Sequence, residues 1–337
     1  GGSGEFADLV TYINTETATR IIFGIVLSVL VAFSIGAFVQ WVTRLLLSYN
    51  FEKKASWIGA LFGGVALTAI TYFIFMKGLK GTSYAKESFD GLGGRTMKEF
   101  LENEVVGIVL VNSVFWSVAS YLLIQFLKVN IYRIIIIVGT FALALAFSGN
   151  DLVNFIGVPI AAWESYLAWS SEYAISRVQA DEFSMSILSK PVRTNNMLLL
   201  VAGLVMVVTL WFSNKAKAVV KTSIDLSSQG ATKERFQPNF LSRGFVRSAM
   251  GISEVVSYLF PQRIKDKVDK QFTPPIIPLT KDKAHELPAF DMVRAAVNLM
   301  VAAVLISIAT SYKLPLSTTY VTFMVAMGTS LADRAWG

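Results

Sequence analysis

The feature that most constrains this chain is a long apolar run that polar residues interrupt in its middle. Residues 131–147 are almost purely aliphatic and aromatic, and apolar sequence resumes at residues 155–162. Between these two stretches the chain reads Ser148-Gly149-Asn150-Asp151-Leu152-Val153-Asn154. A carboxylate at membrane depth costs about 2.5–3.5 kcal/mol on insertion scales, so it is rarely found there without a function.

Gly149 permits the backbone to leave helical geometry, and non-helical backbone at membrane depth is tolerated only where protein or a cavity surrounds it. We therefore expect the span Ile131–Leu167 to be a broken helix, whose two halves meet near Gly149 and Asn150. Asp151 and Asn154 are three residues apart, so they share one face of the second half-helix. A carboxylate with amide carbonyls suits Na⁺, or a proton on Asp151. Simple polar capping of the second half-helix is the alternative.

Composition indicates a membrane protein. Of the 337 residues 54% are hydrophobic and only 16% charged, whereas soluble domains carry roughly 25% charged residues. About 20 apolar residues span a hydrocarbon core, and the stretches that reach or approach this length are Ile21–Leu47, Trp57–Met76, Val105–Leu127, Ile131–Leu167, Met197–Phe212, Phe290–Ala309 and the interrupted Leu314–Leu331. The expected fold is an all-α polytopic membrane bundle with a broken transmembrane helix and a re-entrant or interrupted Ser-Thr-Thr helix.

Charge and hydropathy divide the chain into four parts. Residues 1–16 form an N-terminal flank that begins Gly1-Gly2-Ser3-Gly4 without Met, and we expect a linker or a fragment end there. Transmembrane helices occupy 17–213, a basic loop occupies 214–288, and 289–337 holds a last helix and the Ser-Thr-Thr segment, which we expect to be truncated.

The basic loop explains most of the net charge of +7. Residues 215–286 hold 13 Lys/Arg against 7 Asp/Glu, and the positive-inside rule places such a loop in the cytoplasm. The short loops between the spans are alternately acidic and basic along the chain, and this alternation places the basic ones on the same side as loop 214–288. We expect a multi-pass protein of the cell (inner) membrane with loop 214–288 in the cytoplasm, and no nucleic-acid partner.

A second polar motif reads Leu314-Pro315-Leu316-Ser317-Thr318-Thr319-Tyr320. Pro followed by hydroxyl residues is typical of a helix start, so ordinary capping is one interpretation. An anion site is the other, because helix N-termini present free N–H groups and about half a positive charge. The three hydroxyls of Ser317, Thr318 and Thr319 add donors that can replace the water around an oxyanion.

Catalysis is not expected. An intramembrane hydrolase needs a Ser–His or Asp–Asp pair at membrane depth, and the only histidine, His285, lies in the basic loop. Asp291 lies at the edge of an apolar span beside Arg294, and we interpret the two as an ion pair that snorkels to the membrane surface.

Together the two motifs resemble the PiT family of inorganic phosphate transporters. Members of that family carry Gly-Ala-Asn-Asp-x-x-Asn and Pro-x-Ser-Thr-Thr in each of two inverted repeats, and residues 149–159 and 314–319 look like the copies of the second repeat. This chain has Gly149 in place of the usual Ala and Tyr320 in place of the usual His. No second copy of either motif is found, so the resemblance implies a chain that contains only part of a transporter.

The resemblance implies import of inorganic phosphate by symport with Na⁺ or H⁺. Asn150, Asp151 and Asn154 would bind the coupling cation, with Asp151 and Asn154 as ligands if it is Na⁺, and Ser317, Thr318 and Thr319 would bind phosphate. No other cofactor is implied. The expected partners are phosphate, the coupling ion, the lipid bilayer and the missing first repeat, and a second copy of the chain in a homo-oligomer is a further candidate. An ion channel or a non-transporting membrane subunit is the alternative.

Overall fold

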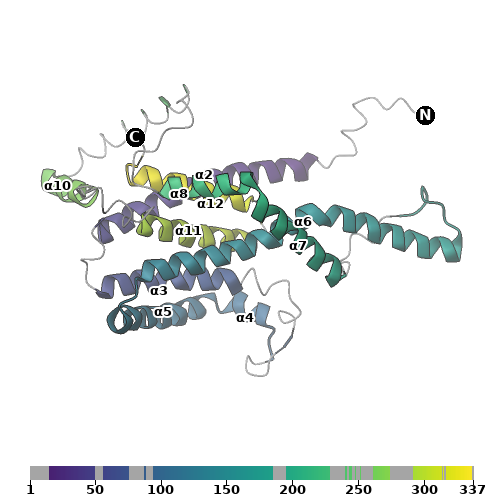
Figure 1. The fold of residues 1–337 in the computed structure, drawn as a ribbon, viewed down its shortest axis with the longest axis horizontal. Helices are drawn as coiled ribbons and strands as arrows, with labels where there is room; N and C mark the ends of the chain where they lie inside the picture. Colours follow the sequence, from purple (N-terminus) through teal and green to yellow (C-terminus); the bar gives the residue numbers. More distant parts are fainter. Residues whose placement is uncertain are drawn as a thin grey trace. The chain divides into compact units, whose positions relative to one another are not determined.

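The computed structural model describes residues 15–49, 56–75, 87–88, 94–184, 195–227, 261–273, 291–312 and 316–335, with the single positions 240, 243, 244, 247, 251 and 314. The described chain is all-α, as the sequence predicts (Figure 1). Its helices are α2 (Thr15–Leu47), α3 (Ser56–Ile74), α4 (Met97–Asn103), α5 (Val105–Leu127), α6 (Ile131–Ser176), α7 (Asn196–Phe212), α8 (Asn214–Ser227), α10 (Gln262–Gln271), α11 (Met292–Ser311) and α12 (Thr318–Ala332). Within these ranges the only β pairing is an isolated bridge between Ser88 and Thr96.

Four helices are long and apolar enough to cross a membrane. They are Ala18–Leu47, Ser56–Ile74, Val105–Leu127 and Met292–Ala309, and α7 with the start of α8 adds a fifth span if this bent pair counts as one. Their bounds lie close to those predicted from hydropathy, because the apolar residues that enter the bilayer also form the helices. The protein is therefore a multi-pass membrane protein.

The predicted break in the helix at residues 148–151 is wrong. Helix α6 runs without interruption over Ile131–Ser176, even past Pro159. Gly, Ser, Asn and Asp each cost at most about 1 kcal/mol in a helix relative to Ala, whereas every backbone group stranded by a break costs several kcal/mol in an apolar medium. The apolar helix on both sides therefore prevails. A bend of 69° occurs instead at Ser213, between α7 and α8.

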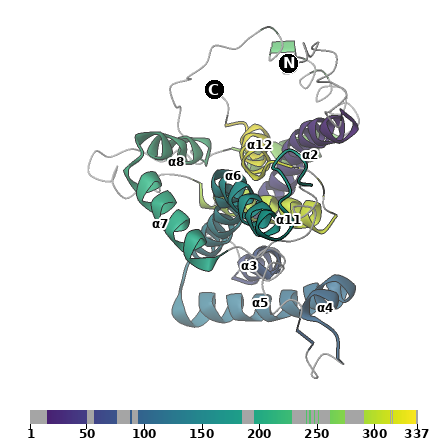
Figure 2. The same cartoon turned by 90° about the vertical axis from the view of Figure 1, so that its right-hand side faces the viewer.

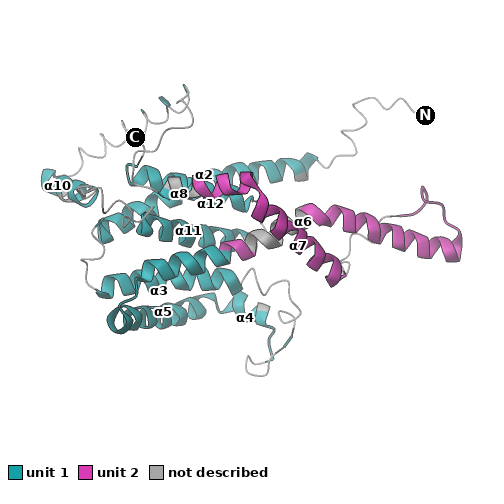
Figure 3. Ribbon diagram, viewed as in Figure 1, with its two compact units in different colours: residues 1–142, 222–337 teal, residues 143–221 magenta. Residues whose placement is uncertain are grey.

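The chain divides into two compact units, which Figure 3 colours separately. Unit 1 comprises residues 1–142 and 222–337, and unit 2 comprises residues 143–221. In unit 1, α11 is the central helix and packs against α2, α3 and α12. Its buried face is mostly small, and its fully buried apolar residues are Val293, Ala296, Val297, Ala302, Ala303 and Ile306. Small residues let membrane helices approach closely, so dispersion contacts hold this bundle together.

Glycines mark the closest helix contacts of unit 1. A Cβ added at Gly328 of α12 would collide with the carbonyl of Phe33 in α2, and one at Gly36 of α2 would lie 2.8 Å from the carbonyl oxygen of Val325. Helices α3 and α5 also lie side by side (Figure 2). There Gly63, which belongs to the GxxxG pattern Gly59–Gly63, faces the Ser120 hydroxyl.

Unit 2 contains the second part of α6, α7 and the start of α8. No residue of α7 is buried. The end of α6 carries a ladder of neighbouring rings, in which Trp163, Tyr166, Trp169 and Tyr173 follow one another with centroids 5.4–6.0 Å apart. Such amphipathic rings are enriched where a membrane helix reaches the interface.

Candidate functional site

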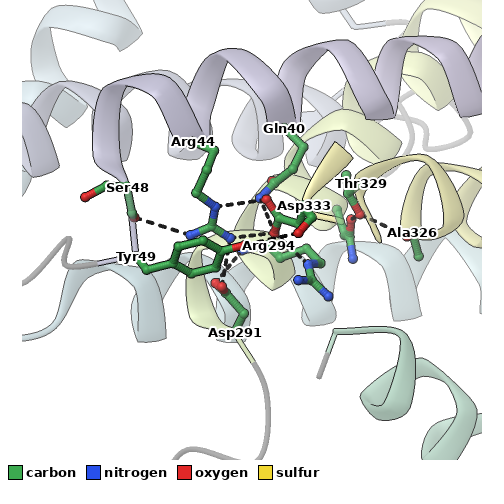
Figure 4. Close-up of polar contacts among 10 residues, drawn as sticks. Gln40, Arg44, Ser48, Tyr49, Asp291, Arg294, Ala326, Thr329 and Asp333 are labelled. Carbon is green, nitrogen blue, oxygen red and sulfur yellow. Dashed lines mark hydrogen bonds and ion pairs between the residues drawn. The ribbon is translucent and has the colours of Figure 1, made fainter. Parts of the chain in front are cut away.

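The most densely connected polar site in the described chain is a cluster of buried charges in unit 1 (Figure 4). It consists of Arg44, Asp291, Arg294 and Asp333, with Gln40 and Tyr49 at its edge, and we call it the charge cluster. Arg44 lies in the last turn of α2, Asp291 and Arg294 at the start of α11, and Asp333 at the end of α12. The side chains of Arg44, Arg294 and Asp333 are fully buried.

Asp333 is the hub of the charge cluster. Its Oδ1 accepts a hydrogen bond from Nε of Arg44 at 2.9 Å. Its Oδ2 accepts three, from Nη2 of Arg44 at 2.5 Å, from Nε of Arg294 at 2.8 Å and from Nε2 of Gln40 at 2.8 Å. Arg44 therefore grips the carboxylate with two nitrogens, a geometry that the planar guanidinium favours.

Asp291 joins the charge cluster from the other side of Arg44. Its Oδ2 accepts from Nη2 of Arg44 at 2.8 Å, and its Oδ1 accepts from the backbone N–H of Arg294 at 3.0 Å. The second bond caps the start of α11, where a carboxylate also interacts favourably with the helix dipole. The backbone N–H of Asp291 donates to the carbonyl of Ser227 at 2.8 Å. This hydrogen bond joins the last residue of α8 to the residue that precedes α11.

Tyr49 covers the charge cluster beyond the end of α2. The Arg44 guanidinium carbon lies 3.9 Å from the centre of the Tyr49 ring, which is cation–π geometry. The Tyr49 hydroxyl donates to the backbone carbonyl of Asp333 at 3.1 Å. Burial, and next the charge of Asp333, raise the pKa of the Tyr49 phenol to about 12.

Electrostatics favours full ionisation of the hub. Burial by itself disfavours the charged carboxylate, but the hydrogen bond and charge of Arg44, together with the charge of Arg294, outweigh it, so the pKa of Asp333 lies below its usual range. Two carboxylates balance two guanidiniums. Burying an ion costs several kcal/mol, and only such pairing and hydrogen bonding offset that cost.

The charge cluster is suited to fastening helices rather than to binding a substrate. Each carboxylate is already occupied by donors of the chain itself, and the groups come from three helices that meet at one end of unit 1. Breaking one pair would leave a buried charge uncompensated, which typically costs about 3–5 kcal/mol. The charge cluster therefore fixes the end of α12 against α2 and α11.

The Ser-Thr-Thr motif begins α12, as predicted. Ser317 is the N-cap, and its hydroxyl oxygen accepts from the N–H of Tyr320 at 3.4 Å. Capping is thus a real role of Ser317. Thr318 is buried, with 5% of its surface exposed, and Thr319 is exposed.

Capping does not use up the donors of this helix start. A serine hydroxyl that accepts one hydrogen bond still has its own O–H to donate. The N–H groups of Thr318 and Thr319 belong to the first turn, which has no intrahelical acceptor for them. The arrangement can therefore donate to an anion.

The structure does not describe the side chains of the predicted cation site. The backbone of Asn150, Asp151 and Asn154 is helical within α6, which leaves Asp151 and Asn154 three residues apart on one helix. Their side chains lie outside the described residues. Among the described residues there is no group of three or more His, Cys, Asp or Glu that could hold a metal ion.

Sequence reasoning missed the charge cluster. The interpretation of Asp291 and Arg294 as a snorkelling surface pair is wrong, because 9% of Asp291 and none of Arg294 is exposed. Arg44 and Asp333 also lie at the ends of apolar stretches, where snorkelling is the usual expectation. The sequence does contain a signal: basic and acidic residues lie at the ends of different apolar spans. These opposite charges can neutralise each other only if the ends of those spans pack together.

Comparison of the chain with models of protein families, with curated proteins and with solved structures found no match in any of the three.

Proposed function

We propose that this chain is one half of a secondary carrier that imports inorganic phosphate by symport with Na⁺ or H⁺. The observation that carries the proposal is the start of α12, where Ser317, Thr318 and Thr319 occupy the N-cap and first two positions of a helix in an apolar bundle. Free N–H groups and the positive helix end favour an anion there. No Arg or Lys is needed, so the anion can also leave.

The coupling ion is part of the proposal because phosphate import alone is uphill. Phosphate carries about −1.5 to −2 charges at pH 7, by analogy with phosphoserine. Moving it into a negatively charged interior costs about 2.3 kcal/mol per charge per 100 mV. A cation at Asp151, with Asn150 and Asn154 as neighbouring oxygen donors, would cancel part of this charge and supply the gradient. A second, inverted repeat would complete the carrier and allow alternating access around a fixed site.

Phosphate binding by hydroxyl variants of the intact protein tests the proposal. A hydrogen bond to a charged group contributes about 1.5–3 kcal/mol, so Thr318→Val should weaken phosphate binding about tenfold or more. Ser317→Ala and Thr319→Val should also weaken it, although Ser317→Ala removes the cap as well and costs about 0.5–2 kcal/mol of stability.

Thr322→Val is the matched control. Thr322 lies one turn further along α12, and its hydroxyl donates to the carbonyl of Thr318 at 2.8 Å. The Thr322 hydroxyl donates only to the carbonyls of Thr318 and Thr319. This variant therefore removes a hydroxyl from the same helix and leaves the N–H and O–H donors of the first turn in place, so phosphate affinity should stay at the wild-type value. Wild-type affinity in all three motif variants would mean that the motif only caps α12.

A further inference from the structure

The junction of α7 and α8 in unit 2 differs from the rest of the described chain. Helix α7 is apolar over 17 residues and buries none of them, so an apolar solvent must cover its whole surface. At about 1.5 Å per residue its length is about 25 Å, close to the hydrocarbon thickness of a bilayer. The residues that directly follow this span therefore lie at the membrane surface.

Ser213 forms a fixed corner after that span. Its N–H donates to the carbonyl of Leu210 at 3.2 Å and closes α7, and its hydroxyl oxygen accepts from the N–H of Ala216 at 3.2 Å and opens α8. The two helices are bent by 69° across this one residue. Since membrane spans tilt on average about 20° from the normal, a bend of this size directs α8 along the membrane surface instead of away from it.

Aromatic and basic side chains flank the corner. Trp211 and Phe212, the last two residues of α7, are each 75% exposed, and Trp is enriched at the headgroup level. Lys215, Lys217 and Lys221 are exposed on α8. Residues 196–221 contain no Asp or Glu, and the one carboxylate of α8, Asp225, follows Lys221 by four residues, so the lysines outnumber the acids of this helix by three to one.

The helical positions of α8 separate an apolar arc from its basic borders. At 100° per residue, Lys215 and Lys217 bound an arc of about 200° that contains Ala216, Val219 and Val220. The two valines are 64% and 59% exposed. Lys217 and Lys221 are four residues apart, and like charges at this spacing repel unless an anion lies between them. This is the pattern of a helix that inserts its apolar arc and directs lysines to headgroups.

We propose that the α7–α8 corner, residues 211–221, is a docking surface for the headgroups of anionic phospholipids. The valine arc and the two aromatic rings enter the interface, and the three lysines bind lipid phosphates at its surface. Each Lys near an anionic surface contributes about 1 kcal/mol, which is about fivefold in affinity. Free phosphate offers the same chemistry, but the exposed apolar arc and the adjoining span favour the lipid.

Lipid-selective quenching tests this in the intact protein. The described sequence contains no Cys, so Val220→Cys accepts a single bimane label on the apolar arc. The labelled protein is reconstituted with either brominated phosphatidylglycerol or brominated phosphatidylcholine as the quencher. We expect at least about fivefold stronger quenching by the anionic lipid, which falls close to equality in Lys215→Gln/Lys217→Gln/Lys221→Gln.

Two arms control for folding and for the source of the phosphate. About 1 M NaCl, where the Debye length is about 3 Å, should abolish the preference with all lysines intact. Arg263→Gln/Lys270→Gln, which neutralises exposed charges of α10, should leave it unchanged. Equal quenching by both lipids in the wild-type protein, or an unchanged preference in the triple lysine variant, would overturn the proposal. The proposal would also be overturned if inorganic phosphate removed the preference for the anionic lipid more effectively than chloride at the same ionic strength, because the site would then bind free phosphate.

Discussion

Helices α7 and α11 have similar lengths, 17 and 20 residues, and both are mostly apolar, yet they differ in burial. No residue of α7 is buried, whereas 61% of the Met292–Ala309 window of α11 is buried inside the protein. Large side chains such as Leu200, Val205 and Trp211 cover α7, and alanines form much of the buried face of α11. Hydropathy therefore predicts that a helix enters an apolar medium, and residue size indicates whether that medium is lipid or protein.

The largest predicted effect concerns the hub of the charge cluster. Asp333→Asn leaves two buried guanidiniums opposite one carboxylate, and we expect the free energy of unfolding to fall by about 3–5 kcal/mol. Chemical unfolding in detergent micelles measures it. Glu16→Gln is the control, because it removes an exposed Arg–Glu pair whose side chains are 74% and 84% exposed, and such pairs contribute about 0.2–1 kcal/mol at most.

A double variant sharpens that prediction. Arg294→Met in the Asp333→Asn background removes one of the uncompensated charges, so the double variant should be more stable than the sum of the two single effects predicts. Strict additivity would show that Arg294 and Asp333 do not interact in the folded protein.

The next largest effect on stability is expected from alanine substitution of glycines in α12 and α7. Gly328→Ala places a methyl group against the Phe33 carbonyl of α2, and overpacking of this kind costs about 1–3 kcal/mol. A Cβ at Gly203 of α7 meets nothing within 4 Å, so Gly203→Ala should be neutral or stabilise by up to about 1 kcal/mol. Melting temperatures of the two variants compare α12 with α7 directly. Equal losses at both positions would contradict the burial of α12 and the exposure of α7.

A pair of threonines gives a smaller effect. The Thr329 hydroxyl donates to Oδ1 of Asn298 in α11 at 2.5 Å, whereas the Thr209 hydroxyl of α7 donates only to the Val205 carbonyl of its own helix. Thr329→Val should destabilise by about 0.5–1.5 kcal/mol because it removes the hydrogen bond to the part-buried amide oxygen of Asn298. Thr209→Val should change stability by less than about 0.5 kcal/mol. Unfolding experiments on both variants in the same detergent measure the difference.

The smallest effect appears at alkaline pH. Because the folded-state pKa of Tyr49 is raised to about 12, the protonated phenol stabilises the fold fully below its unfolded value of about 10. This contribution disappears as the pH rises from about 10 to about 12. Tyr49→Phe should therefore reduce the loss of stability over this range. At neutral pH it should cost about 0.5–1.5 kcal/mol, because it removes the hydrogen bond to the Asp333 carbonyl. If the free energy of unfolding decreases equally steeply with pH in both proteins, ionisation of Tyr49 is not coupled to unfolding.

Much of the fold could be predicted because hydropathy marks membrane helices directly. The predicted spans agree within one residue with both ends of α5 and α7 and with the C-terminal end of α2, which begins six residues earlier than predicted. The Ser-Thr-Thr motif correctly predicts the start of α12. The polar residues and Gly149 that interrupt the apolar run predict a break near residues 149–150, but the cost of unpaired backbone in an apolar medium keeps α6 continuous. The charge cluster could not be derived, because Arg44, Asp291 and Asp333 are far apart in the sequence and only packing of α2, α11 and α12 brings them together.

Phosphate uptake in proteoliposomes by the full-length carrier, with both repeats present, tests the proposed function most directly. Radiolabelled phosphate is followed under an imposed inward Na⁺ gradient, an inward H⁺ gradient or neither. We predict uptake that depends on one of the two gradients, that is lost in Asp151→Ala while the protein stays folded, and that needs about tenfold more phosphate in Thr318→Val. Uptake in neither gradient, or wild-type uptake by both variants, would contradict phosphate symport at these residues.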